Sequence, residues 1–254
     1  MLNKKDFLKY ASKLAFPIMI QNLIGTLVNI ADTVMLGYVS QTAMSASSLA
    51  NQYTFILFCL YYGMATGTSV LCAQYWGKGD KKTVENIACR GFANATTIIV
   101  SQELGQDHID TAREYGKRML RITTIVSIVG CVIILAIRPL ILDFYRDKLT
   151  ETAIYYLGIF IIMTTWRLLG EGINTCLICG CFRGGGDSRF GMIIDSVFMW
   201  LVAVPLTFLA AYVLKLPPIW VYFIMTLDEF EKMPAVFIHY FRGKWLTNIT
   251  RDFE

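Results

Sequence analysis

Residues 33–77, TVMLGYVSQTAMSASSLANQYTFILFCLYYGMATGTSVLCAQYWG, contain no Asp, Glu, Lys or Arg. A soluble domain surface cannot be built from such a run, whereas two membrane spans joined by a short polar link account for it. The whole composition agrees, because 55% of the 254 residues are hydrophobic and only 17% are charged, against roughly 25% charged residues in a soluble protein. The sequence therefore predicts an all-α polytopic membrane protein.

The apolar segments predict about six transmembrane helices, over residues 14–38, 53–76, 122–142, 153–175, 192–214 and 218–240. The segment 83–105 is a poor span because it holds Glu85, Arg90 and Asn94, and a charged amphipathic helix over 107–121 follows it. Basic loops favour the cytoplasmic side of a membrane. We therefore expect 83–105 to form a re-entrant or surface-lying hairpin, and both chain termini to lie in the cytoplasm.

Two segments resemble each other, and such repeats report architecture. They are residues 68–77 (TSVLCAQYWG) and 96–105 (TTIIVSQELG), each with a Gln three residues before a final Gly. They lie too close together for each copy to head its own helical bundle. Transporters built from duplicated halves separate such copies by a whole half. The spacing predicts a two-lobed membrane protein whose middle part is missing.

Asp32 is the only acidic residue of the first predicted span. Ionisable side chains inside spans are rare and are functional candidates by default. A carboxylate there can exchange a proton or hold Na⁺, so we expect Asp32 to contribute to cation coupling or to the substrate path. The alternative is an Asp near the outer end of the span that is solvated or caps a backbone group.

Two later spans also carry polar candidates. Glu171 and Asn174 follow Arg167 by one and two helical turns, and an Arg167–Glu171 ion pair is the simpler reading of that spacing. In the last span, the spacing of Asp228 and Lys232 predicts mutual neutralisation, which leaves Glu229 without Lys232 as a partner. Both groups have two open readings: a cation or substrate path, or polar packing inside the protein. The candidates for a path are Glu171, Asn174, Asp228 and Glu229.

The Gly-rich segment 182–189 (FRGGGDSR) lies between two predicted spans. A phosphate-cradling loop would need a preceding strand and a following helix, so we predict a structural cytoplasmic turn. Its members are Arg183, Gly184, Gly186 and Asp187.

No enzyme or metal site is indicated. Cys176, Cys179 and Cys181 lie in an apolar helix without acidic or His support, which favours buried small side chains over a metal centre. The two histidines, His108 and His239, look isolated, so no catalytic set can be drawn. The net charge of +4 fits the positive-inside bias and not a nucleic-acid partner.

Five segments together resemble the multidrug and toxic compound extrusion (MATE) transporters. They are 29–37 (NIADTVMLG), 73–80 (AQYWGKGD), 102–118 (QELGQDHIDTAREYGKR), 182–190 (FRGGGDSRF) and 243–245 (GKW). The resemblance implies a partial two-lobed bundle in the plasma membrane that exports small organic cations or drugs in exchange for H⁺ or Na⁺, with no other cofactor. It also implies that Asp32 is the first-lobe acid used in cation coupling, and that Glu171 and Asn174 line the second-lobe cavity.

The same resemblance divides the chain into residues 1–92, which are similar to the start of the first lobe, and 93–254, which are similar to most of the second. The join falls near residues 91–93, and helices three to seven of the family and the front of helix eight have no counterpart. Three functions stay open: an antiporter, in which a homo-oligomer could bring part-lobes together; a non-transporting remnant that still inserts in the bilayer; and a lipid or polysaccharide flippase of the wider superfamily.

Overall fold

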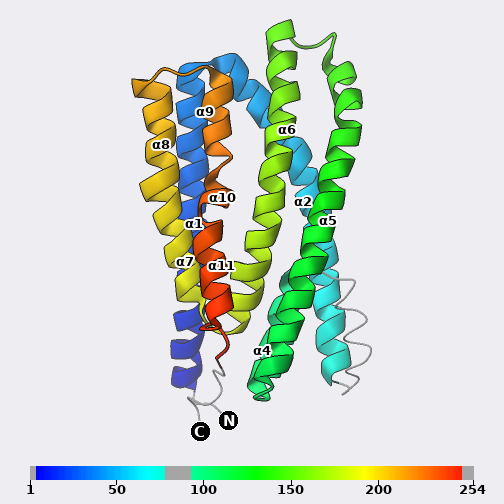
Figure 1. Cartoon of the computed structure of the whole chain (residues 1–254), viewed down its shortest axis with the longest axis vertical. Helices are drawn as coiled ribbons and strands as arrows, with labels where there is room; N and C mark the ends of the chain where they lie inside the picture. Colours follow the sequence, from blue (N-terminus) through cyan, green and yellow to red (C-terminus); the bar gives the residue numbers. More distant parts are fainter. Residues whose placement is uncertain (1–3, 78–92, 248–254) are drawn as a thin grey trace.

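A computed structural model describes residues 4–77 and 93–247, and within these ranges the chain is helical without any β-strand (Figure 1). The elements labelled η are π-helical segments that continue neighbouring α-helices. In chain order the elements are α1 (Lys4–Val39), α2 (Gln41–Gly77), α4 (Ala93–Gly105), α5 (Ile109–Tyr145), α6 (Glu151–Asn174), η1 (Thr175–Phe182), α7 (Ser188–Val197), η2 (Phe198–Ala203), α8 (Val204–Phe208), η3 (Leu209–Val213), α9 (Pro218–Met225), α10 (Asp228–Glu231) and α11 (Met233–Arg242).

Four helical segments are long and apolar enough to cross a membrane, because a crossing needs about 20 apolar residues. They are Ala15–Val39, Ile109–Tyr145, Glu151–Phe182 and Ser188–Val213, and each contains most or all of one predicted span. The second predicted span lies within α2. The chain is therefore a multi-pass all-α membrane protein, as its composition predicts.

The last predicted span, 218–240, is not one helix. It is broken after Met225 and again at Lys232, so that α9, α10 and α11 follow one another as three short pieces. Pro234 lies in the first turn of α11, where its missing N–H costs no hydrogen bond, whereas inside a continuous helix it would clash with the preceding turn. The expectation of a single helix is wrong, and Pro234 accounts for the second of the two breaks.

The predicted hairpin at 83–105 is described only in its second part. Residues 83–92, and with them the predicted domain boundary at 92/93, lie outside the described residues. The second part is α4, which packs against α2, α5 and η1 and buries Val100 and Leu104 completely. The amphipathic segment after it does not form a separate helix, since α5 runs unbroken from Ile109 to Tyr145.

Two apolar cores hold the bundle together. The first joins α1, α2, α5, α6 and α9 around Leu157, Phe160 and Tyr222. The rings of Phe160 and Tyr222 are stacked, with their centroids 4.0 Å apart. The second joins α4, α5, η1 and α11 around Phe182 and Trp245. Small side chains let helices approach closely in membranes, and α2 contributes Ala43, Ala46 and Ala50 to the first core.

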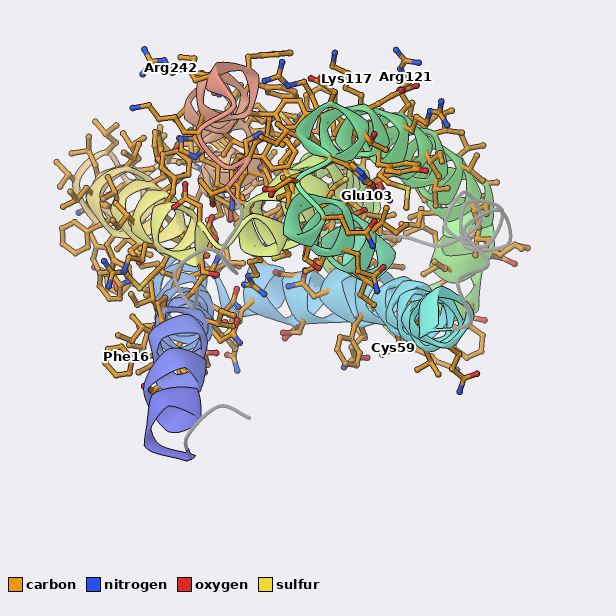
Figure 2. The ribbon with its side chains drawn as sticks, turned by 90° about the horizontal axis from the view of Figure 1, so that it is seen from below. Phe16, Cys59, Glu103, Lys117, Arg121 and Arg242 are labelled. Carbon is orange, nitrogen blue, oxygen red and sulfur yellow. The ribbon has the colours of Figure 1, made fainter. Side chains whose placement is uncertain are left out.

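Helix α1 runs beside α7 and α8, and its N-terminal part stands away from the rest of the bundle (Figures 1 and 2). One of its faces exposes large apolar side chains at helical spacing, as expected of a surface in contact with lipid. These residues are Phe16, Met19, Leu23, Leu27, Ile30, Val34 and Tyr38.

Candidate functional site

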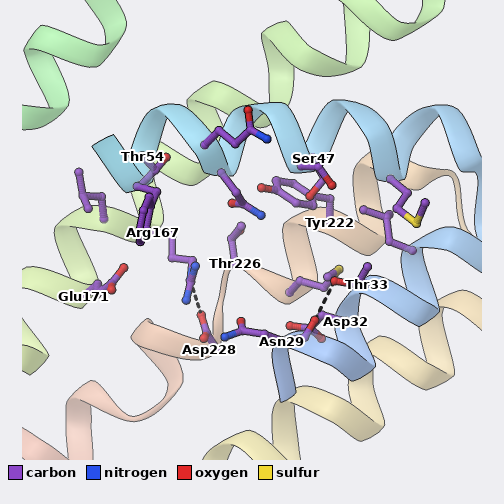
Figure 3. A pocket seen from close by; sticks show the side chains of 18 residues that line it. Asn29, Asp32, Thr33, Ser47, Thr54, Arg167, Glu171, Tyr222, Thr226 and Asp228 are labelled. Atoms are coloured by element: carbon purple, nitrogen blue, oxygen red, sulfur yellow. Dashed lines mark hydrogen bonds and ion pairs between the residues drawn. The ribbon is translucent and has the colours of Figure 1, made fainter. Parts of the chain in front are cut away.

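A polar cavity of about 620 Å³ lies between α1, α2, α6, α9 and α10 (Figure 3). Charged and polar side chains from five helices point into it although the surrounding bundle is apolar. They are Asn29, Asp32, Thr33, Ser47, Ser48, Asn51, Gln52, Thr54, Arg167, Glu171, Tyr222, Thr226 and Asp228.

An ion pair crosses one side of this cavity. Arg167 Nε of α6 lies 3.4 Å from Oδ1 of Asp228, and Asp228 is the first residue of α10 (Figure 3). The same Asp228 oxygen accepts a hydrogen bond from the Glu229 N–H at 2.9 Å. The expected pairing of Arg167 with Glu171 is therefore wrong, because the break before α10 brings Asp228 to the guanidinium.

Asp32 and Glu171 face the same cavity from different helices. Asp32 lies on α1 and is half-buried, and Glu171 lies on α6, one turn beyond Arg167. Thr33 beside Asp32 donates its hydroxyl to the Asn29 carbonyl at 2.8 Å, a bond within the helix. Among the described residues that line the cavity, three acids thus accompany one cation, Arg167. The cavity is suited to positively charged species.

A second group of charged residues lies beside the cavity but does not line it. Lys232 Nζ lies 3.0 Å from Asp195 Oδ1 of α7 and 3.1 Å from Glu229 Oε1. Asn174 at the end of α6 donates its amide to the Glu229 backbone carbonyl at 2.7 Å and to Glu229 Oε2 at 2.8 Å. All four side chains are buried. The structure thus groups Asn174 with Glu229, and Asp32 with Glu171 and Asp228.

The predicted neutralisation of Asp228 by Lys232 is wrong. Helical spacing places residues four apart on one face only within a continuous helix, and α10 ends at Glu231, just before Lys232. Lys232 turns instead to Asp195 and Glu229. Glu229, expected to lack Lys232 as a partner, is bound by both Lys232 and Asn174.

The buried group reaches the first helix through Gln21, which donates its amide to Asp195 Oδ2. The Gln21 oxygen accepts a hydrogen bond from Arg183 at 2.7 Å. Asp195 lies inside the fifth predicted span, and its position there is a signal that the sequence analysis missed. Gln21 gives no such signal, since only its tertiary neighbours distinguish it from other polar residues.

The Gly-rich turn is packed against the segment that follows α11. Gly186 has a φ of 81°, a left-handed conformation that favours glycine. A methyl group on Gly185 would lie 1.7 Å from the Trp245 carbonyl oxygen. Asp187 accepts a hydrogen bond from the Phe190 N–H at the start of α7 and bonds His239 Nε2 at 2.8 Å. The backbone is enclosed on this side, which leaves no phosphate cradle there.

Neither histidine is isolated, contrary to expectation. His239 also stacks on Phe190 at 3.6 Å, and His108 Nδ1 lies 2.9 Å from Glu103 Oε2. Cys176 and Cys181 are buried free thiols. Within the described ranges, no group of three or more His, Cys, Asp or Glu residues could hold a metal ion.

Comparison with known proteins places this geometry in a family. The family model MatE matches residues 17–93 and again residues 87–209, which together cover most of the chain. The chain belongs to the MatE family. This is the family of MATE transporters that its five motifs resemble. The first match contains Asp32 and the second contains Arg167 and Glu171, so both matches contribute to the MatE cavity.

Two curated MatE relatives share part of this chain. The Probable multidrug resistance protein NorM of Thermotoga maritima is 36% identical over 76 residues, which are 30% of this chain and 16% of that protein. The Probable multidrug resistance protein NorM of Halalkalibacterium halodurans is 26% identical over 127 residues, which are 50% of this chain and 27% of that protein. The match therefore spans a minor part of either relative's length. No solved structure matches the chain.

Proposed function

We propose that this MatE chain is a secondary antiporter that exports small organic cations or drugs in exchange for H⁺ or Na⁺. The observation that carries the proposal is the excess of acids over cations in the cavity, with Asp32, Glu171 and Asp228 against Arg167. Both relatives are named probable multidrug resistance proteins, which supports a drug-like substrate. The bilayer is then the plasma membrane, with both termini in the cytoplasm.

Asp32 is the coupling residue in this proposal. Its carboxylate lies on α1, whereas the ion pair of Arg167 and Asp228 occupies another side of the cavity (Figure 3). A cationic substrate and a coupling H⁺ or Na⁺ would compete for the negative charge of Asp32. Such competition for one site links the two fluxes in opposite directions when the unoccupied site does not alternate between the two sides of the membrane. Glu171 would provide a second carboxylate that binds the cationic substrate.

The remaining predicted site residues receive structural roles. Asn174 and Glu229 would fix α10, and with it Asp228, against α6. Arg183, Gly184, Gly186 and Asp187 would form the turn that leads into α7. We also propose that residues 1–92 and 93–254 are parts of two lobes. Two facts support this division: the family model matches twice, and the cavity is lined from both parts.

The test is gradient-driven efflux of a lipophilic cationic dye from proteoliposomes that contain the intact chain. We expect dye efflux that depends on an imposed H⁺ or Na⁺ gradient and is lost in Asp32→Asn. The matched control is Asp147→Asn, which removes one acid from the exposed turn between α5 and α6. Equal efflux by Asp32→Asn and the wild type would exclude Asp32 as the coupling residue.

A second candidate is a non-transporting membrane protein of the same family. The small share of each relative that the chain matches favours it. This candidate predicts that correctly inserted protein, with a native circular dichroism spectrum, gives no gradient-dependent efflux at all. That outcome would overturn the antiporter proposal for this chain. It would do so whether the protein is a monomer or a homo-oligomer.

A further inference from the structure

Three cationic side chains form a stripe on the first turns of α5. Arg113, Lys117 and Arg121 follow one another at intervals of four residues and are exposed, so they share one face of the helix. Within the described residues none of the three takes part in an ion pair. Like charges at this spacing repel, which makes the stripe a site for a negatively charged partner.

Among the described residues, the nearby acids do not pair with this stripe, and Asp110 in the first turn of α5 forms no ion pair with any of its three cations. Glu114 lies 2.6 Å from Arg118, its own partner one turn on. Glu103 of α4 is buried and bonds His108. The positive charge of Arg113, Lys117 and Arg121 is therefore available to an external anion.

The end of α11 extends the same positive surface. Arg242 and Lys244 are exposed. Arg113 lies against Gly243, because a methyl group added to Gly243 would be 3.1 Å from the Arg113 guanidinium. Viewed along the bundle, Lys117, Arg121 and Arg242 point outward from one side of the molecule (Figure 2). They therefore face the surroundings of the bundle and not its interior.

After the stripe in chain order, the same face of α5 becomes apolar. Ile125, Ile128 and Val132 continue the helical spacing after Arg121, and their exposed fractions are 60%, 48% and 59%. Residues 122–137 carry no charge. α5 has 37 residues and is about 55 Å long, which exceeds a hydrocarbon thickness of about 30 Å. Arg121 is therefore the last charged residue before the apolar part of the helix.

We propose that this surface, defined by Arg113, Lys117, Arg121 and Arg242, binds the headgroups of anionic phospholipids. The observations fit one occupant: cations at the level of lipid phosphates, followed on the same face by exposed apolar side chains for the acyl chains. Basic residues next to a membrane attract anionic headgroups electrostatically. The lipid leaflet is the one at the end of the bundle where α5 begins and α11 ends (Figure 1).

The test uses the full chain in bilayers that contain phosphatidylcholine and a spin-labelled lipid, either phosphatidylglycerol or phosphatidylcholine. Electron spin resonance measures the fraction of each label that is immobilised at the protein. We expect the wild type to prefer phosphatidylglycerol, and Arg113→Gln/Lys117→Gln/Arg121→Gln to lose roughly fivefold or more of this preference, since a single juxtamembrane cation contributes about that factor.

The matched control removes three cations at the opposite end of the bundle, as Arg146→Gln/Lys148→Gln/Lys215→Gln. Most of the wild-type preference is expected to remain in this variant. High salt is expected to weaken the wild-type preference, a measurement that does not depend on a variant folding correctly. A wild type with equal immobilisation of both lipids, or a preference that salt and the first triple variant leave unchanged, overturns the proposal.

Discussion

The Lys232 ammonium lies 3.0 Å from the Asp195 carboxylate, and both side chains are buried. This contact joins the break between α10 and α11 to α7, and Gln21 extends it to α1. A broken helix exposes backbone groups that a bilayer cannot satisfy, so such breaks occur where protein encloses them. The Lys232–Asp195 contact therefore helps to hold the broken span that presents Asp228 to the cavity.

Removal of the Lys232 charge is expected to destabilise the protein strongly. Lys232→Met leaves Asp195 and Glu229 without their shared cation, and an unpaired buried charge costs about 3–5 kcal/mol. The measurement is the unfolding midpoint in detergent micelles. Lys148→Met is the control, because Lys148 is exposed and such surface changes stay within about 0.5 kcal/mol. Similar midpoints for both variants would show that the buried contact contributes little.

Cation binding is expected to depend on Asp228. Asp228→Asn removes one of three cavity acids and leaves Arg167 without its partner. One charge interaction over several ångströms at an effective dielectric near 20 amounts to about 1–2 kcal/mol, so the Kd for tetraphenylphosphonium should rise roughly tenfold. Calorimetric titration measures it, with Asp143→Asn at the exposed end of α5 as control. An unchanged Kd in Asp228→Asn would remove this side of the cavity from the binding site.

Two glycines are expected to respond to the same substitution with opposite signs. Gly185→Ala would place a methyl group 1.7 Å from the Trp245 carbonyl oxygen, so the backbone must move. We expect the free energy of unfolding to fall by about 1–3 kcal/mol, the usual range for overpacking. In Gly130→Ala of α5, the added methyl group would meet no atom within 4 Å. The free energy of unfolding should rise by up to about 1 kcal/mol because Ala has the higher helix propensity.

Thermal unfolding of the two glycine variants in the same detergent tests this pair. The contact between the Gly-rich turn and Trp245 would be contradicted if Gly185→Ala unfolded at the wild-type temperature. A marked fall of the unfolding temperature in Gly130→Ala would show instead that lipid or another chain covers this part of α5.

The sequence by itself determined the class of the protein. The uncharged run 33–77 and the later apolar segments are sufficient for an all-α membrane protein, because a bilayer imposes one strong constraint on composition and length. The five motifs were sufficient for the family. Asp32, Glu171 and Asp228 could be named as candidates because a charge is rare in an apolar helix.

Only the tertiary structure decided which charges meet. Helical periodicity relates residues within a few positions of one another, and it predicted Arg167 with Glu171 and Asp228 with Lys232. The observed partners, Arg167 with Asp228 and Lys232 with Asp195, come from different helices. The break at α10 rotates Asp228 and Lys232 to different sides, and buried charges pair with whichever opposite charge the packing brings within reach.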